Sequence, residues 1–256
     1  MNRVNQIGFS QRVRLEWLEE TARLVLAGNN QDAIESLLQK MLHDKVSIDG
    51  TAERGTREKI ITILLKVWVT TPPSLKMFKL DGLDMLKNLP HEKHLAVHWG
   101  MVMAVYPFWP NVASQVGRLL KLQGSAAAAH VQRRVREQYG ERETVSRAAR
   151  RVLTSFRDWG VLNDGMSKGV YVPGLHTAID DAALLCWLIE ASLYARCNWP
   201  AELKDLLESP ALFPFRIKQA QVEGILANSP RMDVVRHGLD ERMVMLRPDK
   251  GRTCQR

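Results

Sequence analysis

The residues in this chain that are best suited to chemistry are arginines, and they gather in residues 142–162, RETVSRAARRVLTSFRDWGVL. If the segment is a helix, its periodicity puts four polar residues on one side: Arg147, Arg150, Arg151 and Thr154. Arg157 lies at the edge of that side, and the opposite side is apolar. Guanidinium groups donate paired hydrogen bonds to phosphate oxygens and to guanine edges. The segment therefore predicts an amphipathic helix whose basic face binds an acidic partner.

The positive charge of the chain is concentrated around this helix. The 256 residues include 36 Lys and Arg against 28 Asp and Glu, a formal net charge of +8. Between Arg118 and Arg157 ten basic residues face three acidic ones, so this segment alone carries +7. A protein that binds the phosphate backbone of a nucleic acid needs such a concentration of positive charge. We expect the interface to consist of Arg133, Arg134, Arg142, Arg147, Arg150, Arg151, Thr154, Arg157 and Lys168.

Histidines in the stretch HEKHLAVH, residues 91–98, are the second set that could do chemistry. His94 and His98 are four residues apart and could bind one metal ion together. HEKH is not the HExxH motif of zinc peptidases, and the neighbouring sequence offers no third ligand. We therefore expect no metal site. The stretch is better explained by polar residues at a helix start, followed by a histidine against a core tryptophan, Trp99.

No set of residues in the sequence matches the pattern of a catalytic site. The chain has neither a phosphate-binding glycine loop nor a GxSxG motif, and Cys186 lies in the apolar stretch ALLCWLIEA, which is typical of a core thiol. We expect no enzymatic activity, no catalytic residue and no cofactor. The cysteines Cys186, Cys197 and Cys254 lack CxxC spacing, and the first residues contain no secretory signal. These observations predict a cytoplasmic protein without a membrane partner.

The elements that must position the arginines are mostly helices. Apolar residues at helical spacing predict helices over 12–27, over NQDAIESLLQKMLHD with Asn30 as its N-cap, and over TREKIITILLKVWV with Thr56 as its N-cap. Further helices are expected over 74–89 and 91–110. Residues 1–110 are thus predicted to form an N-terminal helical bundle.

From Asn111 the pattern changes. Two helices over 111–123 and 125–139 precede the basic helix, 144–159, and turn residues in VLNDGMSKGVYVPG predict a hairpin after it. This order predicts a winged helix-turn-helix over 111–174. Residues 175–256 are expected to contain helices over 177–195, 201–208 and about 215–228, then a terminal β-hairpin in MDVVRHGLDERMVML. The predicted fold class is mainly α.

Three stretches suggest a family. GTREKIITILLKVW (55–68), YPFWPNVASQVGRLL (106–120) and ETVSRAARRVLTSFRDWGVL (143–162) follow one another as in BrxA-like proteins, small helical proteins of BREX phage-defence systems. The chain resembles that family in layout over residues 10–175. The resemblance implies an all-helical, NusB-like protein that binds DNA without being an enzyme, beside a methyltransferase and ATPases. The DNA-binding role that the resemblance implies carries over only to Arg147, Arg150 and Arg151. The segment after residue 200 departs from the pattern of the family.

The expectations combine into one function. We expect a non-enzymatic protein that binds duplex DNA through helix 144–159, as an accessory component of a BREX-like phage-defence system, with other defence proteins as further partners. Hairpin 162–173 would contact the DNA backbone. Two alternatives remain open at this point. The basic face could hold an acidic protein, which would make the chain an adaptor or assembly subunit, or it could bind RNA in the manner of an antitermination factor.

Overall fold

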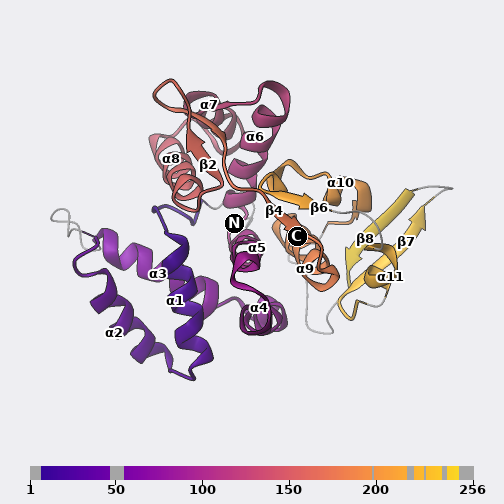
Figure 1. Cartoon of the computed structure of the whole chain (residues 1–256), viewed down its shortest axis with the longest axis horizontal. Coiled ribbons are helices and arrows are strands. Elements are labelled where there is room, and N and C mark those ends of the chain that lie inside the picture. Colours follow the sequence, from indigo (N-terminus) through magenta and orange to yellow (C-terminus); the bar gives the residue numbers. More distant parts are fainter. Residues whose placement is uncertain are drawn as a thin grey trace.

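The computed structural model describes residues 7–46, 55–197, 199–217, 222–227, 229–237 and 241–247. Helices make up most of these residues, with a few short strands between them (Figure 1), so the prediction of a mainly helical chain is confirmed. The first part of the chain follows the expected order: α1 (Leu15–Leu26), α2 (Gln31–Leu42), α3 (Thr56–Trp68), the 3-10 turn η2 (Pro73–Leu75), α4 (Lys76–Asn88) and α5 (His91–Val105).

The starts of these helices differ in how they are capped. Asn30 caps α2 as predicted, because its side-chain oxygen accepts the Ala33 amide at 2.9 Å. The prediction for α3 is wrong: Thr56 is its first helical residue, and the N-cap is Gly55, which has no side chain to accept a bond. Helix α1 begins at Leu15 rather than at residue 12, which leaves residues 12–14 outside the helix.

Helix α5 lies at the centre of the molecule, and α9 (Ala182–Ala195) packs along it (Figure 1). Every α5 residue from His94 to Val105 is buried, as expected for a helix that is apolar on nearly all sides. Gly100 permits the close approach, since a Cβ there would lie 2.4 Å from the indole of Trp187 on α9. None of the helices in the described part of the chain has the length and apolarity that a bilayer span requires.

The middle of the chain has helices in the predicted places and one more strand than predicted. Its elements are α6 (Phe108–Gln123), β1 (Ala126–Ala127), α7 (Ala128–Tyr139), α8 (Glu143–Asp158), β2 (Leu162–Asp164) and β3 (Val170–Pro173). Helix α6 starts before residue 111 because Pro107 and Pro110 occupy its cap and first turn, where proline needs no amide donor. The hairpin of β2 and β3 is present, and β1 adds to it, giving an antiparallel sheet in the order β1-β3-β2.

Short strands take the place of the predicted helix starts in the last part of the chain. The helix expected over 177–195 begins only at Ala182, because the Asp181 carboxylate caps it by accepting the Leu184 amide at 2.7 Å. The residues before it form β4 (Thr177–Ile179), which pairs in parallel with β6 (Phe215–Ile217). β-Branched and aromatic residues in both strands suit this extended pairing.

The other two predicted C-terminal helices are also shorter than expected. Strand β5 (Ala201–Glu202) precedes α10 (Leu203–Leu207), and the 3-10 turn η3 (Pro210–Leu212) follows it. Of the helix predicted over 215–228, the structure has α11 (Val222–Ala227); residues 218–221 and 228 lie outside the described residues, as does Cys254. The terminal hairpin is confirmed: β7 (Met232–His237) and β8 (Glu241–Leu246) pair antiparallel, and β5 joins them.

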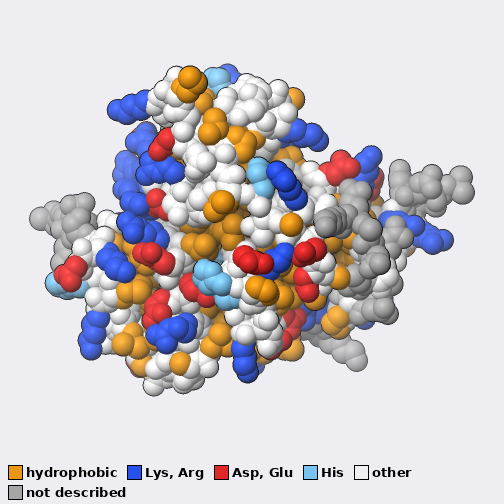
Figure 2. All heavy atoms as spheres, in the orientation of Figure 1, with side chains coloured by type: hydrophobic (Ala, Val, Ile, Leu, Met, Phe, Trp, Pro, Cys, Tyr) orange, Lys and Arg blue, Asp and Glu red, His pale blue; other side chains and the backbone are white. Residues whose placement is uncertain are grey.

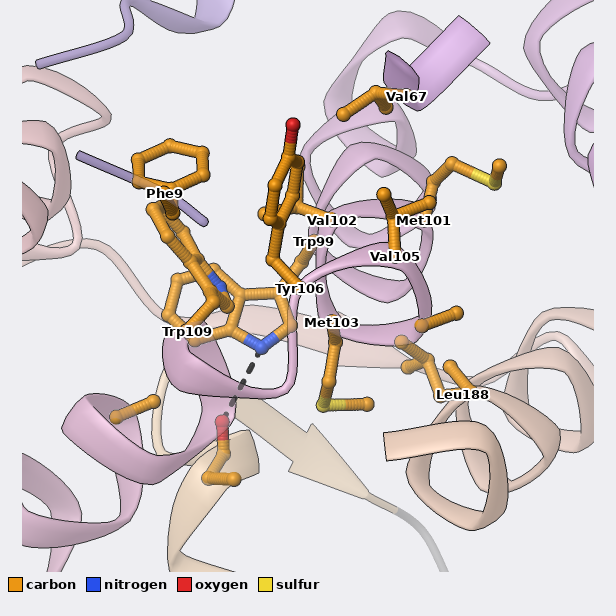
Figure 3. Packing of buried hydrophobic residues seen from close by; sticks show 14 of the residues in the cluster. Phe9, Val67, Trp99, Met101, Val102, Met103, Val105, Tyr106, Trp109 and Leu188 are labelled. Carbon is orange, nitrogen blue, oxygen red and sulfur yellow. Dashed lines mark hydrogen bonds between the residues drawn. The ribbon is translucent and has the colours of Figure 1, made fainter. Parts of the chain in front are cut away.

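Trp99 of α5 holds several of these elements together. Its ring stacks on Phe156 of α8 with centroids 5.0 Å apart and meets Trp109 of α6 edge-on at 5.3 Å. Its Nε1–H donates to the Ala211 carbonyl in η3 at 3.2 Å, the dashed line in Figure 3. Phe9 packs on the other side of Trp109 at 4.8 Å (Figure 3). One fully buried indole thus contacts the middle and the last parts of the chain.

We expect Trp99→Ala to lower the free energy of unfolding by about 3–5 kcal/mol, because it removes a buried ring and leaves a cavity among the other aromatic rings. Urea denaturation followed by circular dichroism measures this loss. Trp199→Ala is the matched control, since 72% of Trp199 is exposed and its removal should change the free energy by no more than about 0.5 kcal/mol. Equal losses in the two variants would contradict the role of Trp99.

Candidate nucleic-acid interface

The basic helix of the sequence is α8, and its apolar side is buried as predicted. Val145, Ala149, Val152, Leu153 and Phe156 are each fully buried. The helix packs on α7 and α6 through this side. Because one side is fixed against the body of the protein, the opposite side of α8 must face outward.

The outward side of α8 carries the predicted arginines. Arg147, Arg150 and Arg151 are exposed, and no carboxylate among the described residues forms an ion pair with them. Lys and Arg side chains follow one another along the edge of the molecule over α8 (Figure 2). Thr154 is half-buried, and its hydroxyl donates to the Arg150 carbonyl of the same helix at 2.9 Å. These three arginines are therefore available to an anion without the loss of an ion pair.

Two further predicted arginines are exposed but paired. Arg157 lies 3.6 Å from Asp164 of β2, and Arg133 of α7 lies 3.8 Å from Glu137. Exposed ion pairs of this kind stabilise a protein by only about 0–1 kcal/mol. An incoming phosphate can therefore take the place of either carboxylate at little cost.

The remaining predicted residues surround α7 and its turns. Arg134 is half-buried on α7, and Arg142 is the N-cap of α8, where its Nη2 donates to the Tyr139 carbonyl at 3.2 Å. Lys168 is exposed in the loop between β2 and β3. That loop is attached to the start of α7, because the Gly169 carbonyl accepts the Ala128 amide at 2.8 Å. The structure thus places Lys168 beside the first turn of α7.

A segment that sequence reasoning missed fixes the end of α8. Arg12 donates from Nε and Nη2 to the two carboxylate oxygens of Asp158, the Val13 amide donates to Ser155 Oγ at 2.9 Å, and Trp159 Nε1–H donates to the Val13 carbonyl at 2.9 Å. Asp158 sits at the negative end of the helix dipole, where an unpaired carboxylate is unfavourable. Residues 12–14 were predicted to be helical. The signal in the sequence for their contact with α8 is Asp158, because a carboxylate at the end of a helix is unfavourable unless a cation lies beside it.

The histidine stretch has a different arrangement from the predicted one. His98 contacts Trp68 rather than Trp99: Trp68 Nε1–H donates to His98 Nδ1 at 3.2 Å, so the proton of the neutral ring is on Nε2. That Nε2–H donates to Glu19 Oε2 at 2.7 Å. His94 Nδ1 lies 2.8 Å from the other oxygen, Oε1. Both histidines thus converge on one carboxylate, which comes from α1 and could not be found near them in the sequence.

Charge and burial shift the pKa values of this group in opposite directions. Burial raises the pKa of the Glu19 carboxyl, but hydrogen bonds and electrostatic attraction from His98 and His94 outweigh burial and lower the pKa to about 2. Burial lowers the pKa of the His98 imidazole below its ordinary value, and Glu19 offsets part of that shift. Glu19 is therefore ionised and His98 neutral in the folded protein at neutral pH.

The thiol of Cys186 is half-buried on α9. Burial, together with the nearby charges of Glu190 and Asp181, raises its pKa to about 11. The thiolate, which is the nucleophilic form of cysteine, is therefore disfavoured at neutral pH.

The free energy of unfolding is expected to fall as the pH drops from about 4.5 to about 2, because unfolded Glu19 takes up a proton in this interval while folded Glu19 remains ionised. His98 adds a loss that begins below pH 6.5, since its ring binds a proton more readily in the unfolded chain. Urea midpoints measured across this pH range test both statements. Glu19→Gln should flatten the curve below pH 4.5, and an unchanged slope in this variant would contradict the assignment.

Comparison with models of protein families, with curated proteins and with solved structures finds no match to this chain. The exposed arginines of α8 and the surfaces beside them are therefore the features of the molecule that indicate a function.

Proposed function

We propose that residues 108–173 form a winged helix-turn-helix and that the protein binds duplex DNA through the arginines of α8, without catalysing a reaction. The observation that carries this proposal is the absence of an ion-pair partner, among the described residues, for the exposed side chains of Arg147, Arg150 and Arg151. A helix face that is merely solvated usually gains stability from opposite charges four residues apart. Here Arg151 follows Arg147 at that spacing, so like charges repel. A bound polyanion relieves this repulsion.

The order and packing of the elements support the same proposal. α7 and α8 pack against each other, β1, β3 and β2 form a small antiparallel sheet beside them, and the apolar side of α8 is buried. A DNA major groove is about 12 Å wide and admits one α-helix. With α8 in the groove, Arg133 and Arg134 of α7 and Lys168 of the hairpin loop would contact phosphates of the DNA backbone.

A role in phage defence is part of this proposal and rests on the resemblance in layout to BrxA-like proteins. The three stretches that carry the resemblance correspond to α3, to the turn between α5 and α6 with most of α6, and to α8 with the residues that follow it. Through that resemblance, other proteins of a BREX-like system are proposed as partners.

We expect the purified protein to shift duplex DNA in a gel, and the triple variant Arg147→Glu, Arg150→Glu, Arg151→Glu to lose the shift. The control variant changes three exposed lysines on α2, α3 and α4 to glutamate: Lys40, Lys59 and Lys87. Both variants change the net charge by the same amount, so a difference in DNA binding between them must come from a specific interface. Loss of binding in both variants, or no shift by the wild type at low salt, would exclude the DNA proposal.

The same assay distinguishes the two alternative functions. RNA of matched length that binds more tightly than the duplex DNA would favour an RNA-binding protein. Capture of an acidic protein by the wild type and the lysine variant, but not by the arginine variant, together with no DNA shift, would favour an adaptor.

The dependence of DNA affinity on salt gives a second prediction. Each single change Arg147→Ala, Arg150→Ala or Arg151→Ala should reduce the slope of log affinity against log salt by about 0.9, because one phosphate contact is lost. Fluorescence anisotropy across a salt series measures the slope. Lys59→Ala should leave the slope unchanged, and a change of similar size in this control would mean that the slope reports overall charge only.

A further inference from the structure

Three side chains bring possible metal ligands together between α1 and the first turn of α5. One ligand atom from each of Glu19, His91 and His94 lies within 4.8 Å of the other two. His91 and His94 are three residues apart and share one face of α5, and their ring centroids are 5.1 Å apart. Two imidazole nitrogens and a carboxylate oxygen are ligands that divalent transition metals prefer.

Both ring nitrogens of His94 lie within hydrogen-bond distance of oxygen atoms. Its Nε2 lies 3.1 Å from the Leu89 carbonyl, which can only accept, so Nε2 must carry a proton. Its Nδ1 lies 2.8 Å from Glu19 Oε1, which is also an acceptor. Nδ1 of His94 and Oε1 of Glu19 are thus already directed at each other, and a metal ion bound between them would take the place of the proton that they share.

The groups around Glu19 and His94 restrict the orientation of both side chains. In metal sites the second ring nitrogen of a histidine ligand usually donates to a backbone carbonyl or a carboxylate, and carboxylate ligands are themselves hydrogen-bonded. Leu89 accepts from His94, and buried His98 donates to Glu19 Oε2 at 2.7 Å. Trp68 in turn fixes the ring of His98. Both inner ligands are therefore oriented before any ion arrives.

The three ligands open onto a cavity with room for further ligands. The cavity has a volume of about 860 Å³, and its lining includes all three residues and the end of α8. Two arginines also line it, but Arg12 is paired with Asp158 and Arg14 lies 3.5 Å from Glu16. Each guanidinium thus has a carboxylate partner of its own.

We propose that Glu19, His91 and His94 bind one divalent transition-metal ion, best matched by Zn²⁺, with its fourth position open to the cavity. In a tetrahedral zinc site the ligand atoms lie roughly 3.3–3.6 Å apart. The pair Glu19–His94 must open slightly to reach that spacing, and exposed His91 must turn its ring inward. The sequence prediction of no metal site rested on the lack of a third ligand beside His94 and His98. The fold brings Glu19 of α1 to His94, with His91 rather than His98 as the other histidine. This proposal is independent of DNA binding.

Isothermal titration of the full chain with ZnCl₂ tests the proposal, after treatment with a chelator and without an added histidine tag. We expect one ion per chain and no binding of Mg²⁺. His91→Ala should weaken Zn²⁺ binding at least roughly tenfold, since even the loss of a group that only orients a ligand has an effect of that size. His91 is exposed, so this variant should keep the circular dichroism spectrum of the wild type.

His43→Ala is the matched control, because His43 is also exposed and also lies beside a carboxylate, Asp44, at 2.7 Å. It should leave Zn²⁺ binding unchanged. Glu19→Gln is a second test of the ligand set and should weaken binding as His91→Ala does. Failure of the wild type to bind Zn²⁺, or equal weakening in the His43 and His91 variants, would overturn the proposal.

Discussion

The packing of the Trp99 indole is the interaction on which the rest of the molecule depends. Trp99 comes from the central helix, and its ring contacts Phe156 of α8, Trp109 of α6 and Phe213 after η3. The residue of α8 that contacts this ring determines how the helix is rotated about its own axis. Because Phe156 does so, the side with Arg147, Arg150 and Arg151 must face solvent. The direction of the basic face is thus decided by apolar contacts rather than by charge.

Local periodicity predicted much of this arrangement, since the apolar face of α8, the order of the helices and both hairpins follow from residues near one another in sequence. Contacts between distant residues were missed. Thr177 pairs with Phe215 across a parallel sheet, and nothing in either segment identifies its partner. The same holds for Arg12 with Asp158 and for Glu19 with His94 and His98. Each missed pair joins an element to one far away, and only the packing of the whole chain decides such partners.

The two polar sites differ in how their charges are balanced. On α8 the guanidinium groups of Arg147, Arg150 and Arg151 have no counter-charge among the described residues, so their balance must come from solvent ions or a partner. In the other site Glu19 is enclosed by two histidines and hydrogen-bonded to both. The first site suits a large, exchangeable polyanion. The second suits a small ion that replaces a proton, because its ligands are already oriented and partly shielded from water.

The segment before α1 has a mechanical consequence for any duplex held on α8. It is joined to the end of α8 through Val13, Ser155 and Trp159, and Phe9 anchors it against Trp109 of α6. Helix α8 is therefore held along its apolar side and at its end, which restrains it from pivoting. A duplex that did not match this surface would have to bend, and the free energy of that bending would come from deformation of the nucleic acid rather than of the protein. Base-pair steps that bend easily would then be preferred at positions the protein never touches.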